Sequence, residues 1–233
     1  NIVLPDADLD LAITDGVKRC FINSGQSCIA PTRMLVPAAM LDEVVDRARA
    51  VAAEVVVGDP TRAETTMGPV AGAAQFAKVE GMIETGIAEG ARLVEGGPGR
   101  PQDLNRGFFV RPTIFADVAP DMRIAREEIF GPVLSVLTFR TPAEAIAKAN
   151  NTPYGLSAGI WSDKGSKILA VADKLRAGVI WANTFNRFDP ASPFGGYKES
   201  GYGREGGRHG LGAYLTTQAV EDRPAQPDAS RAS

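Results

Sequence analysis

Apolar residues recur every three or four positions in several segments of the chain, the spacing that places them on one face of a helix. In the first segment Asp8 is a suitable N-cap, and the stripe from Leu9 to Phe21 ends at the Asn23-Ser24-Gly25 break. The sequence TPAE at 141–144 has the form of a capping box with proline at the first helical position. The pattern therefore predicts helices at residues 9–21, 41–55, 76–87, 142–150 and 163–178.

Short runs of branched and aromatic residues alternate with these helices. They predict strands at residues 32–37, 91–95, 108–118, 132–139, 157–162 and 179–183, with a helical turn at 121–130. Because strands and helices alternate, the expected fold class is α/β, with a largely parallel twisted sheet flanked by helices. Residues 214–220 resemble one lone strand, and the last dozen residues have the composition of a disordered tail.

Composition narrows the classes of function that such a fold can serve. The chain has 233 residues, 44% of them hydrophobic, which suffices for one large or two small domains. A net charge of -3 without a basic stripe argues against a nucleic-acid binder, and no apolar run approaches the ~18 residues of a membrane-spanning helix. The chain's 2 cysteines suit neither a disulfide framework nor a zinc site, so we expect no metal and a reducing, cytoplasmic setting.

The two cysteines have different surroundings in the sequence. Cys20 lies on the apolar stripe of the first helix, which predicts a buried side chain. Cys28 follows the Gly25 break, where a turn can expose a thiol and aim backbone N–H groups at an oxyanion. Position alone leaves two interpretations of Cys28, a reactive nucleophile or a turn cysteine that packs. His209, the single histidine available to a cysteine–histidine hydrolase, lies in a glycine-rich charged segment that favours a surface position.

Three further segments have both a functional and a structural interpretation. The carboxylates of EEIFGP (127–132) either hold ligand hydroxyls at a sheet edge or simply end a helix before a strand. Asn183, Phe188 and Phe194 either line a pocket or pack in the core. The glycine-dense segment at 192–205 fits neither phosphate-binding pattern, so a tight backbone crossing is the better interpretation.

The stretch FINSGQSCIAPTR (21–33) resembles the cysteine signature of the NAD(P)-dependent aldehyde dehydrogenases. EEIFGPV (127–133), WANTFN (181–186) and SPFGGYKESGYGRE (192–205) are similar to three further motifs of that family, in the family's order. The likeness covers roughly residues 1–221. It implies that Cys28 attacks the carbonyl of a small-molecule aldehyde, that the thiohemiacetal gives hydride to NAD or NADP, and that water hydrolyses the resulting thioester.

The resemblance also implies roles for the other candidate residues. Glu128 matches the carboxylate that holds the nicotinamide-side ribose, and Phe130 matches the aromatic residue beside it. The backbone N–H of Cys28 would form half of the oxyanion site. Positions along the substrate funnel of the family correspond to Asn183, Phe188 and Phe194.

The family's water-activating glutamate and the residues of its dinucleotide-binding fold lie upstream of the position that matches Asn1. We therefore expect a truncated chain that is inactive alone, without a cofactor-binding domain. The expected divisions are a catalytic domain at 1–200, a C-terminal helix and oligomerisation strand at 201–221, and a disordered tail at 222–233. The full-length protein is expected to form a homodimer or homotetramer. The alternatives are a non-catalytic scaffold relative, or a cofactor-independent cysteine esterase or acyltransferase.

Overall fold

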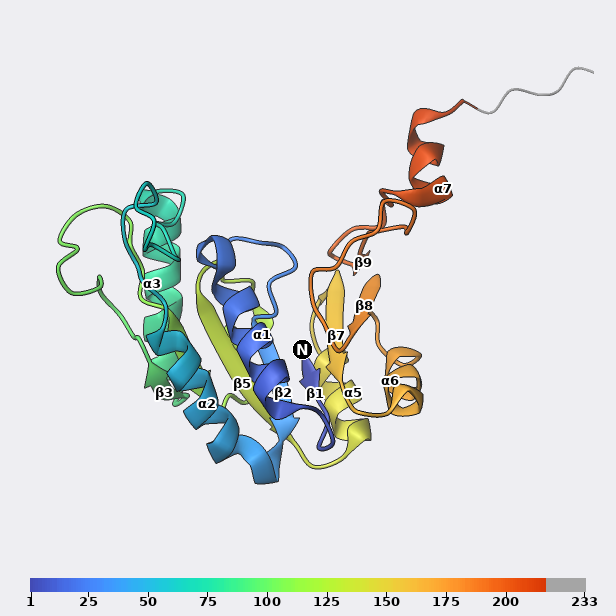
Figure 1. The fold of residues 1–233 in the computed structure, drawn as a ribbon, viewed down its shortest axis with the longest axis horizontal. Coiled ribbons are helices and arrows are strands. Elements are labelled where there is room, and N and C mark those ends of the chain that lie inside the picture. Colours follow the sequence, from blue (N-terminus) through green and yellow to red (C-terminus); the bar gives the residue numbers. More distant parts are fainter. Residues whose placement is uncertain (217–233) are drawn as a thin grey trace, which may run out of the picture.

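A seven-stranded sheet forms the centre of the molecule in the computed structural model, which describes residues 1–216 (Figure 1). All neighbouring strands of this sheet are parallel except the first pair, so the predicted α/β fold with a largely parallel sheet is confirmed. In spatial order the strands are β3 (Arg92–Glu95), β4 (Thr113–Ala116), β5 (Val133–Phe139), β2 (Arg33–Pro37), β1 (Ile2–Val3), β7 (Ser157–Trp161) and β8 (Val179–Ala182).

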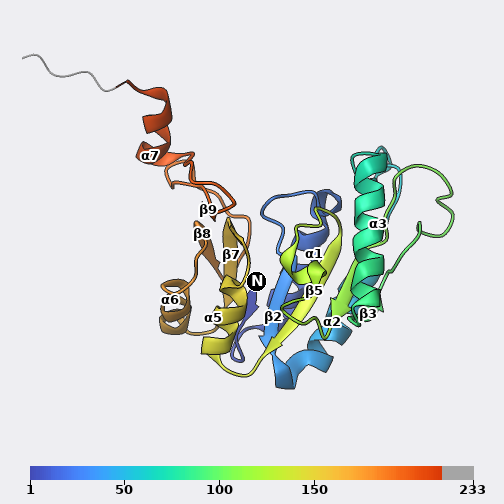
Figure 2. The same cartoon turned by 180° about the vertical axis from the view of Figure 1, so that it is seen from behind.

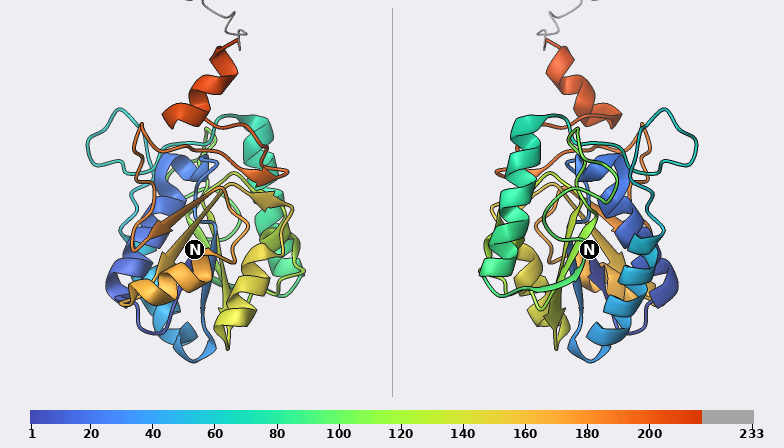
Figure 3. Two further views of the ribbon diagram at one scale, coloured as in Figure 1. Left: turned by 90° about the vertical axis from the view of Figure 1, so that its right-hand side faces the viewer. Right: turned by 90° about the vertical axis from the view of Figure 1, so that its left-hand side faces the viewer.

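Helices cover both faces of this sheet. They are α1 (Leu9–Phe21), α2 (Leu41–Ala53), α3 (Ala73–Ala88), α4 (Arg123–Arg126), α5 (Pro142–Asn150), α6 (Gly165–Ala172) and α7 (Gly207–Leu211). Seen along the sheet in Figure 3, α1 and α2 lie on one side, and α3 and α5 lie on the other. One apolar cluster fills each layer, so the strands are buried on both faces, as parallel sheets require.

Helix α1 shows how local sequence signals fix an element. The Asp8 carboxylate accepts a hydrogen bond from the Leu11 N–H at 3.0 Å, as an N-cap does. The stripe that includes Val17 and Cys20 is fully buried between the sheet and α2. The helix ends at Phe21, as predicted, and a short 3₁₀ turn over Ile22–Gly25 follows it.

Helix α5 has the predicted cap with one difference. The Thr141 hydroxyl accepts a hydrogen bond from the Glu144 N–H at 3.2 Å. The Glu144 carboxylate returns to the N–H of Arg140 at 2.8 Å, one residue before the cap itself. Both bonds satisfy backbone donors that would otherwise lack a partner at the start of the helix.

Some strands differ from their predicted extents. The strand predicted at 108–118 is confined to Thr113–Ala116, because Pro112 has no N–H to give to a ladder. Strand β1 was not predicted, since its two residues are defined only by pairing with β2 and β7. Strands β6 (Tyr154–Gly155) and β9 (Tyr197–Lys198) form a separate two-stranded sheet that the pattern also did not indicate.

The C-terminal part of the described chain leads away from the sheet and ends beyond α7, shown in red in Figures 1 and 2. A Cβ at Gly178 would overlap the carbonyl oxygen of Gly195, and one at Gly195 would overlap that of Gly203. The glycine-dense segment is therefore the tight backbone crossing that the sequence favoured. Of the strand predicted at 214–220, Tyr214 ends a 3₁₀ turn, while residues 217–220 and the predicted tail lie outside the described residues.

Candidate active site

A cavity of about 330 Å³ opens at the amino ends of β2, β5 and β7. The turns that enter β2 and β5 bring Cys28, Glu128 and Phe130 to its wall, and the start of β7 contributes Ser157 from the other side. Parallel sheets commonly bind ligands at the carboxyl ends of their strands, so this cavity lies at the opposite edge. Cys28 lies about a hundred positions from Glu128 and Phe130 in the sequence, yet the three candidate residues share one site.

The cysteine turn, defined as residues 23–28, begins with three consecutive residues in the left-handed region. Asn23, Ser24 and Gly25 have φ angles of 53°, 56° and 69°. Glycine is required at the third position for a second reason, since a Cβ there would overlap the carbonyl group of Gly131. The turn then leaves the Cys28 side chain exposed at the cavity.

The two cysteines differ in burial and in hydrogen bonding. Cys20 is fully buried, and its Sγ donates to the carbonyl oxygen of Val133 at 3.6 Å. Burial raises the pKa of the Cys20 thiol far above its usual range, so this thiol stays neutral. Cys28 is exposed, and its backbone N–H meets no acceptor within the described part of the chain. The predicted packing of Cys20 is confirmed, and Cys28 is open to a reagent.

The glutamate turn, defined as residues 127–131, separates two adjacent carboxylates. Arg123 binds both oxygens of Glu127, at 2.7 and 2.9 Å, and this pairing lowers the pKa of Glu127. Glu128 is exposed at the cavity, and no hydrogen bond or ion pair to it is found over residues 1–216. Phe130 adopts a left-handed φ of 57° and lies half-buried beside it. Glu128 is therefore the carboxylate available to a ligand.

One cation, Arg33, lines the cavity, and Lys198 lies next to the lining residue Glu199; both donate to carbonyl groups at or just after the end of helix α5. The Arg33 guanidinium donates to the carbonyl oxygen of Lys148 at 2.7 Å, and Lys198 donates to those of Asn150 and Thr152 at 2.9 Å. Burial lowers the pKa of Arg33, and burial also lowers that of Lys198. A positive charge at a helix C-terminus is favourable, so these side chains are fixed in place.

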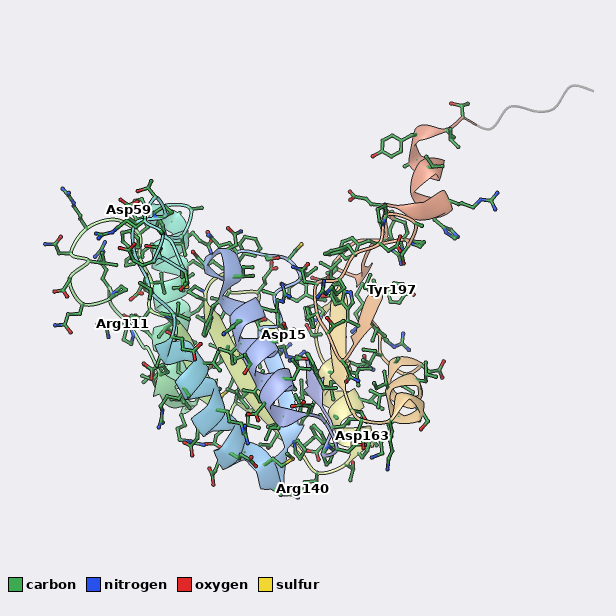
Figure 4. The ribbon with its side chains drawn as sticks, in the orientation of Figure 1. Asp15, Asp59, Arg111, Arg140, Asp163 and Tyr197 are labelled. Carbon is green, nitrogen blue, oxygen red and sulfur yellow. The ribbon has the colours of Figure 1, made fainter. Side chains whose placement is uncertain are left out.

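The predicted substrate residue Asn183 lies outside this cavity wall. Its Oδ1 accepts from the Ser162 N–H and its Nδ2 donates to the Ser162 carbonyl oxygen, both at 2.9 Å. This pair joins the carboxyl ends of β7 and β8. Figure 4 shows the neighbouring Asp163 at the far end of the sheet from Tyr197. The structure thus gives Asn183 a backbone-holding contact, and its substrate role stays a prediction.

Phe188 and Phe194 also lie outside the wall, in an aromatic cluster. Phe188 packs edge-on against Trp181 and Phe194, with ring centroids 5.6 and 5.2 Å apart. Their predicted place in a substrate funnel is likewise untested. Phe185, from the same segment, does line the cavity, and it packs over Gly159. The sequence offered no signal that distinguished Phe185 from its neighbours.

Other classes of site find little support in the described residues. His209 is exposed on α7, away from the cavity, as its surroundings indicated. No group of three or more potential metal-ligating side chains occurs within residues 1–216. Over the same range, none of the helices has both the length and the apolar character needed to cross a membrane.

Comparisons with known proteins agree with the geometry. The model of the aldehyde dehydrogenase family matches residues 1–220. The 3-succinoylsemialdehyde-pyridine dehydrogenase of a Pseudomonas species is 48% identical over 94% of this chain and 46% of its own length. Human mitochondrial aldehyde dehydrogenase is 44% identical over 94% of this chain and 42% of its own. The chain therefore spans about half the length of these curated relatives.

Solved structures give the same result. Aldehyde dehydrogenase C of Pseudomonas syringae, a mutant complexed with NAD+ and octanal, superposes with a TM-score of 0.92 at 50% identity, covering 97% of this chain and 47% of that one. A Mycobacterium tuberculosis aldehyde dehydrogenase complexed with NAD+ gives a TM-score of 0.88 at 44% identity, covering 91% and 44%. By sequence and by fold, the chain belongs to the aldehyde dehydrogenase family.

Proposed function

We propose that this chain carries the nucleophilic chemistry of an enzyme that oxidises an aldehyde to a carboxylic acid with NAD or NADP. The observation that supports it best is the exposure of Cys28 in a cavity shared with the unpaired carboxylate of Glu128. A family relationship indicates the type of reaction, and this geometry supplies a nucleophile and a carboxylate that can bind ligand hydroxyl groups.

Cys28 performs the covalent steps. Its thiolate adds to the aldehyde carbonyl carbon, and the carbonyl oxygen becomes an oxyanion that the free Cys28 N–H can stabilise. When hydride leaves the carbon, the C=O bond reforms and a thioester remains on Cys28. Water then adds to the thioester carbonyl, the C–S bond breaks, and the acid and the free thiol are released.

The residues present fit the nicotinamide end of a dinucleotide. The oxidised nicotinamide, when bound, accepts the hydride. Glu128 offers an unpaired carboxylate to ribose hydroxyl groups, and Phe130 offers an apolar surface beside it. A cavity of about 330 Å³ suits only part of so large a molecule. We propose that the remainder is bound by the kind of segment that the relatives carry in the half of their length this chain does not span.

The 233-residue chain alone is proposed to turn over poorly, because the water-activating carboxylate and most of the cofactor site are expected upstream. General acid–base catalysis contributes about 10²–10⁴-fold in rate, and its loss would slow hydrolysis of the thioester. An acyl group transferred to Cys28 from an activated ester should then persist long enough for mass spectrometry. Rapid NAD-dependent aldehyde oxidation by the isolated chain would contradict this part of the proposal.

The decisive test extends the chain upstream through its reading frame and follows reduction of NAD and of NADP with a panel of aldehydes. We expect turnover to require Cys28. Glu128→Gln should lower turnover at limiting dinucleotide by raising the KM for the dinucleotide. Glu127→Gln is the matched control, because Arg123 already occupies Glu127. Turnover that survives Cys28→Ala would refute the assignment.

A further inference from the structure

The cysteine turn holds two of its residues in a backbone conformation that is unfavourable for them. Two non-glycine residues, Asn23 and Ser24, hold left-handed conformations in succession. Such conformations persist only where surrounding contacts determine them. The local side-chain and turn bonds join Asn23 and Gln26: the Asn23 side-chain amide donates to the Gln26 carbonyl oxygen at 3.0 Å, and the Gln26 backbone N–H and side-chain amide donate to the Asn23 carbonyl oxygen at 3.1 and 3.4 Å. None of these bonds involves the Ser24 side chain. The remaining restraint must come from elsewhere in the chain.

The segment at residues 68–75, called here the support segment, supplies that restraint. The buried Ser24 hydroxyl donates to the carbonyl oxygen of Gly68 at 2.9 Å and lies 3.3 Å from that of Pro69. The Gln26 side-chain oxygen accepts from the Ala71 N–H at 2.8 Å. Two side chains of the cysteine turn are therefore bonded to backbone groups of one short segment.

The same segment also holds the glutamate turn. Gln75, in the first turn of α3, donates its amide to the carbonyl oxygens of Ile129 at 3.0 Å and Phe130 at 2.6 Å. These bonds flank the left-handed Phe130, the strained position of that turn. One helical turn further along, Val79 packs against Gly131.

The two turns also touch each other, since Gly25 lies against the Gly131–Pro132 peptide with no room for a Cβ. We propose that the support segment sets the position of Cys28 relative to Glu128, with Ser24, Gln26 and Gln75 as positioning residues. None of the three residues lines the cavity, so their side chains are not expected to contact a substrate. Their function is to hold the nucleophile and the ligand-binding carboxylate as one rigid unit. The functional meaning of this unit rests on the proposed function, whereas its rigidity does not.

The test uses a probe on the exposed Cys28 to report the loss of hydrogen bonds between Gln75 and the glutamate turn, in which Cys28 takes no part. Alkylation with a trifluoromethyl ketone reagent places a ¹⁹F probe on Cys28, while the buried Cys20 remains unlabelled in the folded chain. Gln75→Ala removes bonds to the glutamate turn only. We expect the ¹⁹F line of Cys28 to shift and broaden in Gln75→Ala. Gln102→Ala, an exposed glutamine of the loop before β4, is the matched control and should leave the line unchanged.

Hydrogen exchange of the unlabelled chain gives a second, independent readout. Loss of a hydrogen bond typically changes an opening equilibrium about fivefold, so Gln75→Ala and Ser24→Ala should each raise amide exchange in both turns by about that factor. Exchange that rises only in the directly bonded turn, together with an unchanged ¹⁹F line, would overturn the proposal. Neither readout requires turnover, so a failure of the aldehyde assignment would leave this result standing.

Discussion

Helix α1 and the cysteine turn are consecutive in the chain, and each carries one cysteine. In the helix a regular hydrogen-bonded backbone presents Cys20 to the apolar layer, where burial keeps the thiol protonated. In the turn, side chains of Ser24 and Gln26 bond to backbone groups of the distant support segment, and Cys28 is presented to a cavity. The difference teaches that reactivity here depends on the conformation that ends the helix, because the residue type is the same.

Replacing each cysteine by alanine is expected to give the largest difference between the helix and the turn. Cys28→Ala should lower aldehyde oxidation by the upstream-extended protein by about four orders of magnitude or more, because no second nucleophile replaces the thiol. Cys20→Ala should keep the activity and cost about 1 kcal/mol of stability, since it removes one buried atom. Steady-state kinetics and urea unfolding measure the two effects. Equal losses of activity in both variants would contradict the assignment of Cys28 alone as the nucleophile.

The rates of alkylation by iodoacetamide should differ between the two thiols almost as strongly. Cys20 can react only when the protein opens, so its rate should be lower than that of Cys28 by a factor of about 10³ or more. Peptide mass spectrometry over time measures both rates in one sample. The difference should vanish in denaturant, which serves as the control. Comparable rates in the native protein would mean that the helix does not protect its cysteine.

A methyl group at Gly25 should break the turn while leaving the helix intact. Gly25→Ala combines left-handed strain with overlap against the Gly131 carbonyl, for an expected loss of about 3 kcal/mol. Gly90, just after α3, has a φ of 90°, but an added Cβ there would meet no other atom within 4 Å, so Gly90→Ala should cost only about 1–2 kcal/mol. Urea unfolding compares the two variants. Equal losses would show that the contact with Gly131 is unimportant.

The smallest expected effect concerns pH and the buried thiol. An unfolded thiol ionises near pH 8.5, whereas burial raises the pKa of Cys20 in the folded protein, so the folded state retains a proton that the unfolded state loses. This contribution to stability is complete below about pH 8.5 and falls by up to about 1.4 kcal/mol per pH unit above it. Urea unfolding near pH 7 and near pH 10 should show wild type losing more stability than Cys20→Ala. Parallel losses in the two proteins would contradict the burial argument.

The sequence predicted those parts of the fold that depend on neighbouring residues. Helix α1 follows from its apolar spacing and the Asp8 cap, and Thr141 likewise marks the start of α5. It did not predict β1 or the β6–β9 pair, because strands of two residues carry no periodicity and exist only through their partners. Pattern rules register local preference, and these elements depend on tertiary pairing.

The candidate site divides in the same way. The glycine break predicted a turn that can expose Cys28 but left open whether it reacts or packs, and only the family resemblance favoured a nucleophile; the burial of Cys20 follows from the apolar stripe. The contribution of Gln75 could not be predicted, since its bonds reach Ile129 and Phe130 more than fifty positions away. The residue pattern alone gave Glu127 and Glu128 equal standing; the resemblance favoured Glu128, and in the structure Arg123 occupies Glu127.

Strand β1 has a consequence for how the cavity comes to exist. Among the strands described, it is the one ladder that joins the four-stranded part β3-β4-β5-β2 to the pair β7-β8, through Ile2 opposite Leu35 and Ile160. The pairing of Ile2 with Ile160 joins residues far apart in the sequence, and forming such non-local contacts is entropically costly and slow. The cavity around Cys28 should therefore form late in folding, and deletion of the first four residues should allow the β3-β4-β5-β2 part and the β7-β8 pair to separate.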